Sequence, residues 1–289
     1  MLYLEKNKEI FREFYGLSCA ENYFLYILFC NRYNYELLYY RSYLPMTDIF
    51  FSFTKGKEKY ASYSKISRLP DVAVETGLAE FNLLEYSDIS GIDIDCDVNY
   101  LIGVKPEFIE YRYKTKLWRE DHYLLLCNKT GDGEYGYVND TPRDQGTIKL
   151  VELNENYNGK VLSIRLIRGI TSSDENVFLS SFKQRLSHQD NLKSFFCTSE
   201  YDNIRDALGV LRISRKRIKS YCSLYINTEF MDQYLQFLDQ EYLALEYCRI
   251  KNRLDYDRIN QDIAMMFEWD KEICNKLWER MNARYEKSS

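Results

Sequence analysis

The sequence contains few of the residues that build metal sites. Its 289 residues include only two histidines and eight cysteines. The closest two cysteines, Cys19 and Cys30, are 11 positions apart (30 − 19), so the chain has no CxxC pair. Structural zinc sites usually draw on close pairs of cysteine and histidine. We therefore expect neither a zinc site nor a resident cofactor, and we expect reduced cysteines that pack as small apolar residues.

Long apolar runs and an excess of basic charge are also missing. No run of 18 apolar residues is present to span a membrane. The first 12 residues mix charged with apolar side chains and lack the apolar core of a signal peptide, which predicts a cytoplasmic protein. The 39 basic and 44 acidic residues give a net charge of −5. This balance argues against nucleic-acid binding, which needs a basic surface, and suits a cationic small substrate.

Proline is confined to the first half of the chain, where the last one is Pro142. Strand-like runs rich in Tyr, Leu and Val lie at 100–104, 122–128 and 135–140. Beyond residue 150 the pattern is helical, with a helix starting near Ser172 and further helices at about 200–225, 228–250 and 254–284. The sequence therefore predicts an α+β protein with an antiparallel sheet in residues 1–150 and a helical region in residues 151–289.

Cys19 lies at the predicted start of a helix. Ser18, with Glu21 three positions later and an apolar run from Tyr23 to Cys30, has the pattern of a capping box with Ser18 as the N-cap. The free N–H groups of a helix N-terminus favour a thiolate and lower a cysteine pKa. Cys19 is therefore a candidate nucleophile, and the alternative is a structural cysteine in the core.

The segment from His122 to Asp140 has the pattern of a β-hairpin, with its turn at the glycines near position 131. A turn centred on Gly131 places His122 directly opposite Asp140, with Asn139 pointing away. An offset of one residue pairs Asp140 with Tyr123 instead. In the first register the carboxylate is close enough to orient the imidazole. Cys19, His122 and Asp140 then form a nucleophile, a base and an orienting acid.

Three stretches of residues 10–145 resemble the family of the N-terminal domain of butirosin biosynthesis protein H, within the papain-like cysteine superfamily. They are the helix start Ser18-Cys19, the run 100–104 with its continuation 110–113, and the hairpin from His122 to Asp140 followed by Thr141-Pro142. The resemblance implies a papain-like catalytic domain in which Cys19, His122 and Asp140 take the catalytic positions. Papain-like peptidases also have a glutamine before the nucleophile that donates to the oxyanion, but this chain has no glutamine before Cys19. The second oxyanion donor is therefore unassigned.

The resemblance further implies an acyltransferase of specialised metabolism, such as antibiotic biosynthesis. Cys19 would take the acyl group from the phosphopantetheine thioester of an acyl carrier protein and pass it to a small amine, such as an aminoglycoside. Two alternatives stay open: a thioesterase, peptidase or cyclase with the same triad, and a non-catalytic interaction protein. A basic cluster in a predicted helix is a candidate surface for the acidic carrier protein, with a solvated helix face as its alternative. The cluster consists of Arg212, Arg215, Lys216, Arg217 and Lys219. The helical region either covers the active site or forms a separate domain.

Overall fold

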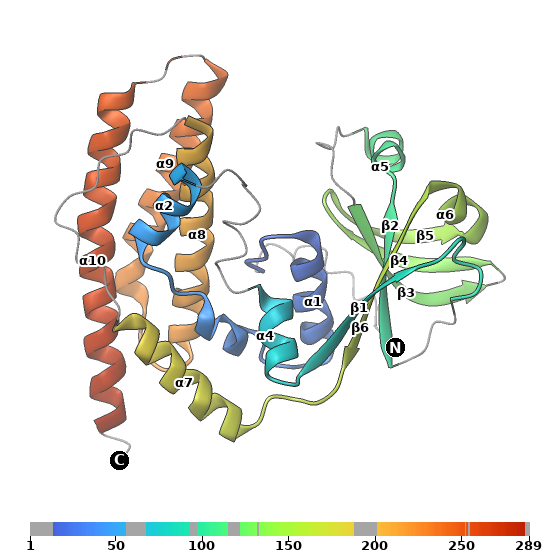
Figure 1. Cartoon of the computed structure of the whole chain (residues 1–289), viewed down its shortest axis with the longest axis horizontal. Coiled ribbons are helices and arrows are strands. Elements are labelled where there is room, and N and C mark those ends of the chain that lie inside the picture. The colour runs from blue at the N-terminus through green and yellow to red at the C-terminus, as the bar shows by residue number, and fades with distance from the viewer. Residues whose placement is uncertain are drawn as a thin grey trace. The chain divides into compact units, whose positions relative to one another are not determined.

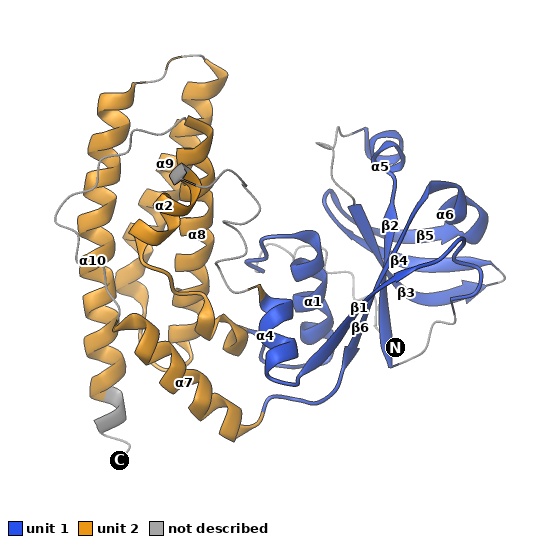
Figure 2. Cartoon of the chain, in the orientation of Figure 1, with its two compact units in different colours: residues 1–35, 69–170 blue, residues 36–68, 171–289 orange. Residues whose placement is uncertain are grey.

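A computed structural model describes residues 14–55, 68–92, 97–114, 122–131, 133–187, 201–251, 253 and 255–286 (Figure 1). The chain forms two compact units. Unit 1 comprises residues 1–35 and 69–170, and unit 2 comprises residues 36–68 and 171–289 (Figure 2). None of the helices in the described part of the chain is both long enough and apolar enough to cross a membrane.

Unit 1 is built on an antiparallel sheet of six described strands, in the order β1-β6-β2-β3-β4-β5. The predicted α+β class and antiparallel sheet are thus confirmed. The strands are β1 (Ala79–Glu85), β2 (Val98–Val104), β3 (His122–Gly131), β4 (Glu134–Asp140), β5 (Arg143–Lys149) and β6 (Tyr157–Leu166). The three predicted strand runs correspond to β2, β3 and β4.

Helices pack on the sheet because alternate strand residues are apolar and point to the same face. Ile102 of β2 and Leu124 of β3 belong to a buried cluster with Phe108 of α5 (Pro106–Tyr113) and Leu153 of α6 (Leu150–Asn156). Helix α1 (Cys19–Cys30) contacts β3 and β4, and it also contacts α4 (Leu69–Glu75). Helix α1 is therefore held against the strands that carry the predicted histidine and aspartate.

Unit 2 is helical. It contains η2 (Tyr35–Arg41, which starts at the last residue of unit 1), α2 (Met46–Lys55), α7 (Ser172–Leu186), α8 (Tyr201–Ser223), η3 (Glu229–Met231), α9 (Asp232–Ile250) and α10 (Tyr256–Glu286). The predicted helices near 200–225, 228–250 and 254–284 correspond to α8, α9 and α10. The helix predicted to start near Ser172 is α7, and its N-cap is Thr171, whose hydroxyl forms a complete capping box with the carboxylate of Asp174.

A buried ion pair lies inside unit 2. The guanidinium of Arg215 in α8 donates from Nε and Nη2 to the two carboxylate oxygens of Asp270 in α10, at 2.6 and 2.7 Å. The hydroxyl of Tyr234 in α9 also donates to Asp270, at 2.7 Å. All three side chains are buried. These hydrogen bonds offset part of the cost of burying the two charges. Because the three side chains come from different helices, the bonds link α8, α9 and α10.

The boundary between the two parts differs from the one expected at residue 150. Strand β6 follows residue 150 in the sequence and pairs with both β1 and β2, so unit 1 continues to residue 170. In the other direction, residues 36–68 belong to the helical unit because α2 packs on α8. The helical unit is therefore discontinuous in sequence, and a single cut of the chain does not separate the two units.

Candidate active site

Cys19 is the first residue of α1, as the capping pattern predicts. Ser18 is the N-cap, with an extended backbone, and its side-chain oxygen accepts from the N–H of Glu21 at 3.2 Å. The carbonyl of Ser18 accepts from the N–H of Asn22 at 3.0 Å. The N–H groups of Cys19 and Ala20 face the Cys19 sulfur instead. The fold therefore places a half-buried thiol at a helix N-terminus, beside the N–H groups of Cys19 and Ala20.

Glu21 does not complete the capping box with the N–H of Ser18. Its buried carboxylate accepts from the N–H of Leu17 at 2.5 Å and from the N–H of Leu69 at 2.9 Å. Leu69 is the first residue of α4. Glu21 thus fixes the segment that precedes Cys19 and ties it to a second helix, which holds the thiol in position.

His122, the first residue of β3, is paired with Asn139 and not with Asp140. The imidazole Nε2 and the Asn139 Oδ1 are 2.6 Å apart, and both side chains are buried. The Asn139 Nδ2 donates to the carbonyl of Pro142 at 2.9 Å, which directs its oxygen toward the ring. Asn139 therefore holds the imidazole, and the expectation that it points away is wrong.

The observed strand register explains this contact. Leu125 pairs with Val138 and Leu126 with Tyr137, so the residue numbers of each pair sum to 263. Pairing His122 with Asp140 would need a sum of 262. Continuing this register places Asn139 opposite Leu124, on the same face as His122 and diagonal to it. The same register sets Asp140 opposite Tyr123, which is the alternative offset that the sequence left open. The register that paired His122 directly with Asp140 is wrong.

Asp140 ends β4 and contacts α1. Its Oδ2 accepts from the Asn22 Nδ2 at 3.1 Å, and its backbone N–H donates to the Tyr23 hydroxyl at 3.1 Å. Burial raises the pKa of the Asp140 carboxyl, whereas Asn22, His122 and Tyr23 act in the opposite direction. Asp140 thus belongs to the site as a buried carboxyl group beside Cys19 and His122. Contrary to the prediction, the imidazole is hydrogen-bonded to Asn139 and not to Asp140.

Tyr23 joins the three elements of the site. Its fully buried hydroxyl donates to the carbonyl of Tyr123 at 2.6 Å and accepts from the N–H of Asp140. It also lies 3.5 Å from the Asn139 Oδ1. Sequence reasoning missed Asn22, Tyr23 and Asn139. The spacing of Asn22 and Tyr23, three and four residues after Cys19, places them one helical turn further along α1 and is the signal that could have found them.

The electrostatics of the thiol differ from the expected acidity. Burial, followed by the neighbouring Asp140 carboxylate, raises the pKa of the Cys19 thiol to about 12. The N–H groups of Ala20, Tyr123 and Cys19 act in the opposite direction but do not outweigh these two effects. The N–H groups of the helix N-terminus thus act in the predicted direction on the pKa of Cys19, but burial and Asp140 outweigh them, so attack by Cys19 needs a base.

The basic cluster of α8 does not form the open surface expected for an acyl carrier protein. Arg215 and Arg217 are fully buried. Arg212 and Lys216 both bind Asp239, and Lys219 binds Asp232. The half-buried members of the cluster, Arg212, Lys216 and Lys219, are thus paired with carboxylates of α9.

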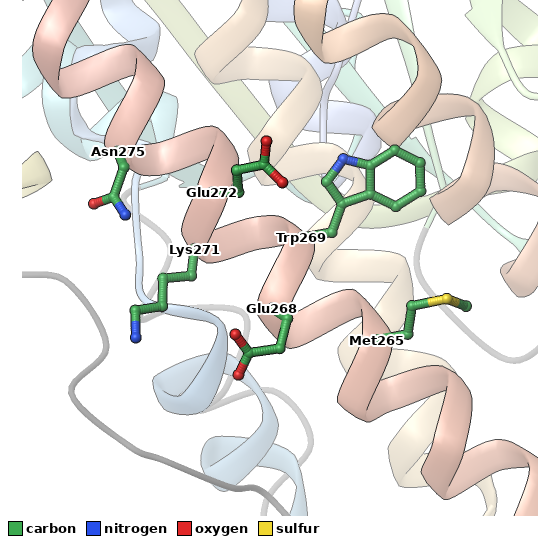
Figure 3. A pocket seen from close by; sticks show the side chains of 6 residues that line it. All are labelled: Met265, Glu268, Trp269, Lys271, Glu272 and Asn275. Carbon is green, nitrogen blue, oxygen red and sulfur yellow. The ribbon is translucent and has the colours of Figure 1, made fainter.

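A separate hollow of about 540 Å³ lies along α10 (Figure 3). Its described lining residues all come from this one helix and are Met265, Glu268, Trp269, Lys271, Glu272 and Asn275. The ring of Trp269 packs against Phe237 of α9, with centroids 5.4 Å apart. The described lining residues of this hollow include no cysteine, serine or histidine, unlike the site around Cys19.

Comparison with known proteins adds no assignment. No family model matches the sequence, and no curated protein is significantly similar to it. The resemblance to the butirosin biosynthesis protein H family therefore stays a prediction, and the geometry around Cys19 carries the functional proposal.

Proposed function

We propose that this protein is a cysteine acyltransferase of the papain-like type, which moves an acyl group from a carrier-protein thioester to a small amine. The observation that carries the proposal is the His122–Asn139 pair at the ends of β3 and β4, in the same unit as the helix-terminal thiol of Cys19. A nucleophile, a base and a group that orients the base are the minimum set for covalent acyl transfer.

The hydrogen bonds indicate which ring nitrogen exchanges the proton. Asn139 presents its oxygen to the His122 Nε2, so Nε2 carries a hydrogen and Nδ1 keeps its lone pair. His122 Nδ1 takes the Cys19 proton as the sulfur forms a bond with the thioester carbonyl carbon. The tetrahedral species then collapses by breaking the bond to the carrier sulfur, and His122 returns the proton to that leaving thiolate. The Cys19 N–H, at the start of α1, supplies one oxyanion donor.

The second half of the reaction releases the enzyme. An amine attacks the acyl-Cys19 carbonyl carbon and His122 takes a proton from the amine nitrogen. The bond to the Cys19 sulfur breaks as the amide forms, and His122 gives the proton to that sulfur. The net charge of −5 favours a cationic acceptor over an anionic one. Water in place of the amine gives hydrolysis, and an internal nucleophile gives cyclisation, so the acceptor must be identified by experiment.

Intact-protein mass spectrometry tests the proposal. The wild type, Cys19→Ala and Cys30→Ala are mixed briefly at pH 7 with a panel of acyl-pantetheine thioesters. Cys30 is the matched control because it is the last residue of the same helix and is also a half-buried cysteine outside any disulfide. We expect an acyl adduct on the wild type and Cys30→Ala, and none on Cys19→Ala.

Adding a diamine to the adduct then distinguishes the reactions. Release of an amide supports acyl transfer, whereas release of free acid alone at the same rate as without amine assigns a thioesterase. Absence of an adduct from every donor would overturn the proposal and leave the non-catalytic interaction protein as the better description.

A further inference from the structure

Helix α9 carries apolar side chains on two opposite sides. Leu238 and Leu245 are buried, and α9 contacts α8 and α10. Leu243, Tyr247 and Ile250 are instead 64%, 61% and 71% exposed. Because successive residues of an α-helix lie about 100° apart around its axis, these three form one outer stripe on the side opposite to Leu238 and Leu245. Single exposed apolar residues are ordinary, whereas a contiguous apolar patch marks an interaction surface.

The spacing of the outer stripe is that of a coiled-coil seam. Tyr247 follows Leu243 by four positions (247 − 243), and Ile250 follows Tyr247 by three (250 − 247). Gln240 and Gln236 continue this alternation of three and four toward the start of the helix, and both are exposed. A seam with this period stays in contact with a second helix along its length. The shape that fits the outer stripe is therefore another amphipathic helix.

The charged residues beside the outer stripe select the direction of that helix. Asp239, Glu246 and Arg253 follow one another at intervals of seven residues, so they border the stripe on one flank. The N–H of Arg253 donates to the carbonyl of Cys248 at 2.9 Å, which keeps this exposed residue at the end of α9. A second α9 that runs antiparallel places the basic end of each helix beside the acidic part of the other, whereas a parallel copy sets like charges together. Both acids also bind basic residues of their own chain, so the charges set direction more than affinity.

One antiparallel register keeps the whole outer stripe in contact. When Leu243 lies opposite Tyr247 of the second copy, Ile250 lies opposite Gln240, and all four positions are within α9, which ends at Ile250. The same register brings Arg253 beside Asp239 of the second copy. Moving one copy to the next register of the seam pairs Tyr247 with Ile250 and leaves Leu243 facing the segment after the helix, so this alternative uses less of the stripe.

We propose that the outer stripe of α9 binds the same stripe of a second copy of this chain, with the two helices antiparallel and related by a two-fold axis. The inference does not depend on the chemistry at Cys19. Stable interfaces bury about 800 Å² on each partner, and one stripe of three side chains provides less. The dimer is therefore reversible, and its fraction depends on protein concentration.

Sedimentation velocity over a series of concentrations tests the dimer on the full chain. The variant is Leu243→Gln with Tyr247→Gln, which removes most of the outer stripe and keeps good helix formers. The matched control is Val177→Gln, because Val177 of α7 is also 64% exposed. We expect the wild type and the control to shift from monomer to dimer as concentration rises. In the double variant we expect the dissociation constant to rise by about tenfold or more, because two apolar side chains no longer gain from burial.

Cross-linking tests the direction of the helices. Tagged Gln240→Cys and untagged Ile250→Cys proteins are mixed and treated with a short bismaleimide, and the linked peptides are identified by mass spectrometry. In the proposed register the two introduced thiols face each other, whereas like positions are ten residues apart (250 − 240), about 15 Å along the helix. We expect links between the two variants and few between copies of the same variant. The wild type is the control for links through the native cysteines.

A wild type that stays monomeric at every concentration overturns the inference and leaves the outer stripe to a helix of another protein. A double variant that dimerises as the wild type does, or links mainly between like positions, overturns it as well. Circular dichroism checks the fold of each variant. If the double variant does not fold, Ile250→Gln removes part of the stripe at the last residue of the helix and should weaken the dimer in the same direction.

Discussion

The hydroxyl of Tyr23 is the single atom on which the geometry of the site most depends. It donates to the Tyr123 carbonyl at 2.6 Å and accepts from the Asp140 N–H at 3.1 Å, and its side chain is fully buried. Tyr23→Phe removes this oxygen and keeps the ring, so packing is nearly unchanged. The variant removes the hydroxyl that the half-buried Tyr123 carbonyl and the buried Asp140 N–H bind in the wild type.

The expected loss follows from those two groups. An unsatisfied buried polar group costs about 1–3 kcal/mol, so Tyr23→Phe should lower the free energy of unfolding of unit 1 by about 2–4 kcal/mol. The Asp140 amide should also exchange its hydrogen faster, because its acceptor is gone. The end of β4 is then less constrained, and acylation of Cys19 should slow with it.

Native-state hydrogen exchange measures both effects, from the core amides of β3 and β4 and from the Asp140 amide itself. The control is Tyr111→Phe, which removes an exposed hydroxyl in α5 and should change stability by less than about 0.5 kcal/mol. A loss below about 1 kcal/mol in Tyr23→Phe, with unchanged exchange at Asp140, would refute the role assigned to this hydroxyl.

Two further changes test the support of the site and of unit 2. An ideal Cβ at Gly16 lies 2.1 Å from the Asn22 Oδ1, so Gly16→Ala should displace this amide from its carboxylate partner. Adduct formation should slow several-fold, whereas Gly91→Ala, where a Cβ meets nothing within 4 Å, should have no effect. Asp270→Ala leaves the buried Arg215 without its carboxylate and should destabilise unit 2 by about 3–5 kcal/mol, and replacing both by Met and Leu should recover most of this in thermal unfolding.

Helix α1 and the helices α7 to α10 were more predictable than strands β1 and β6, which are neighbours in the sheet. Helix α1 follows from the cap at Ser18 and the apolar run after it, and α8 to α10 follow from helical periodicity without proline. Strand β6 includes Gly159, which has a positive φ, and polar residues near its start, so its pattern does not alternate clearly. Strand β1 is an edge strand with exposed residues on both faces. Their pairing depends on contacts distant in sequence, which local patterns do not encode.

The chemistry of the site depended on a detail that the sequence alone does not determine. The register of the β3–β4 hairpin shifts between Leu126 and Asn128 and again between Lys129 and Gly131, and each shift adds one residue to β3. Because successive side chains point to opposite faces of a strand, a change of one residue decides which of two neighbours shares the face of the histidine. Asn139 thereby takes the hydrogen bond to His122, and Asp140 turns toward α1. A sequence pattern that identifies a histidine and an aspartate therefore predicts the place of the site, whereas the bulges decide which residue orients the base.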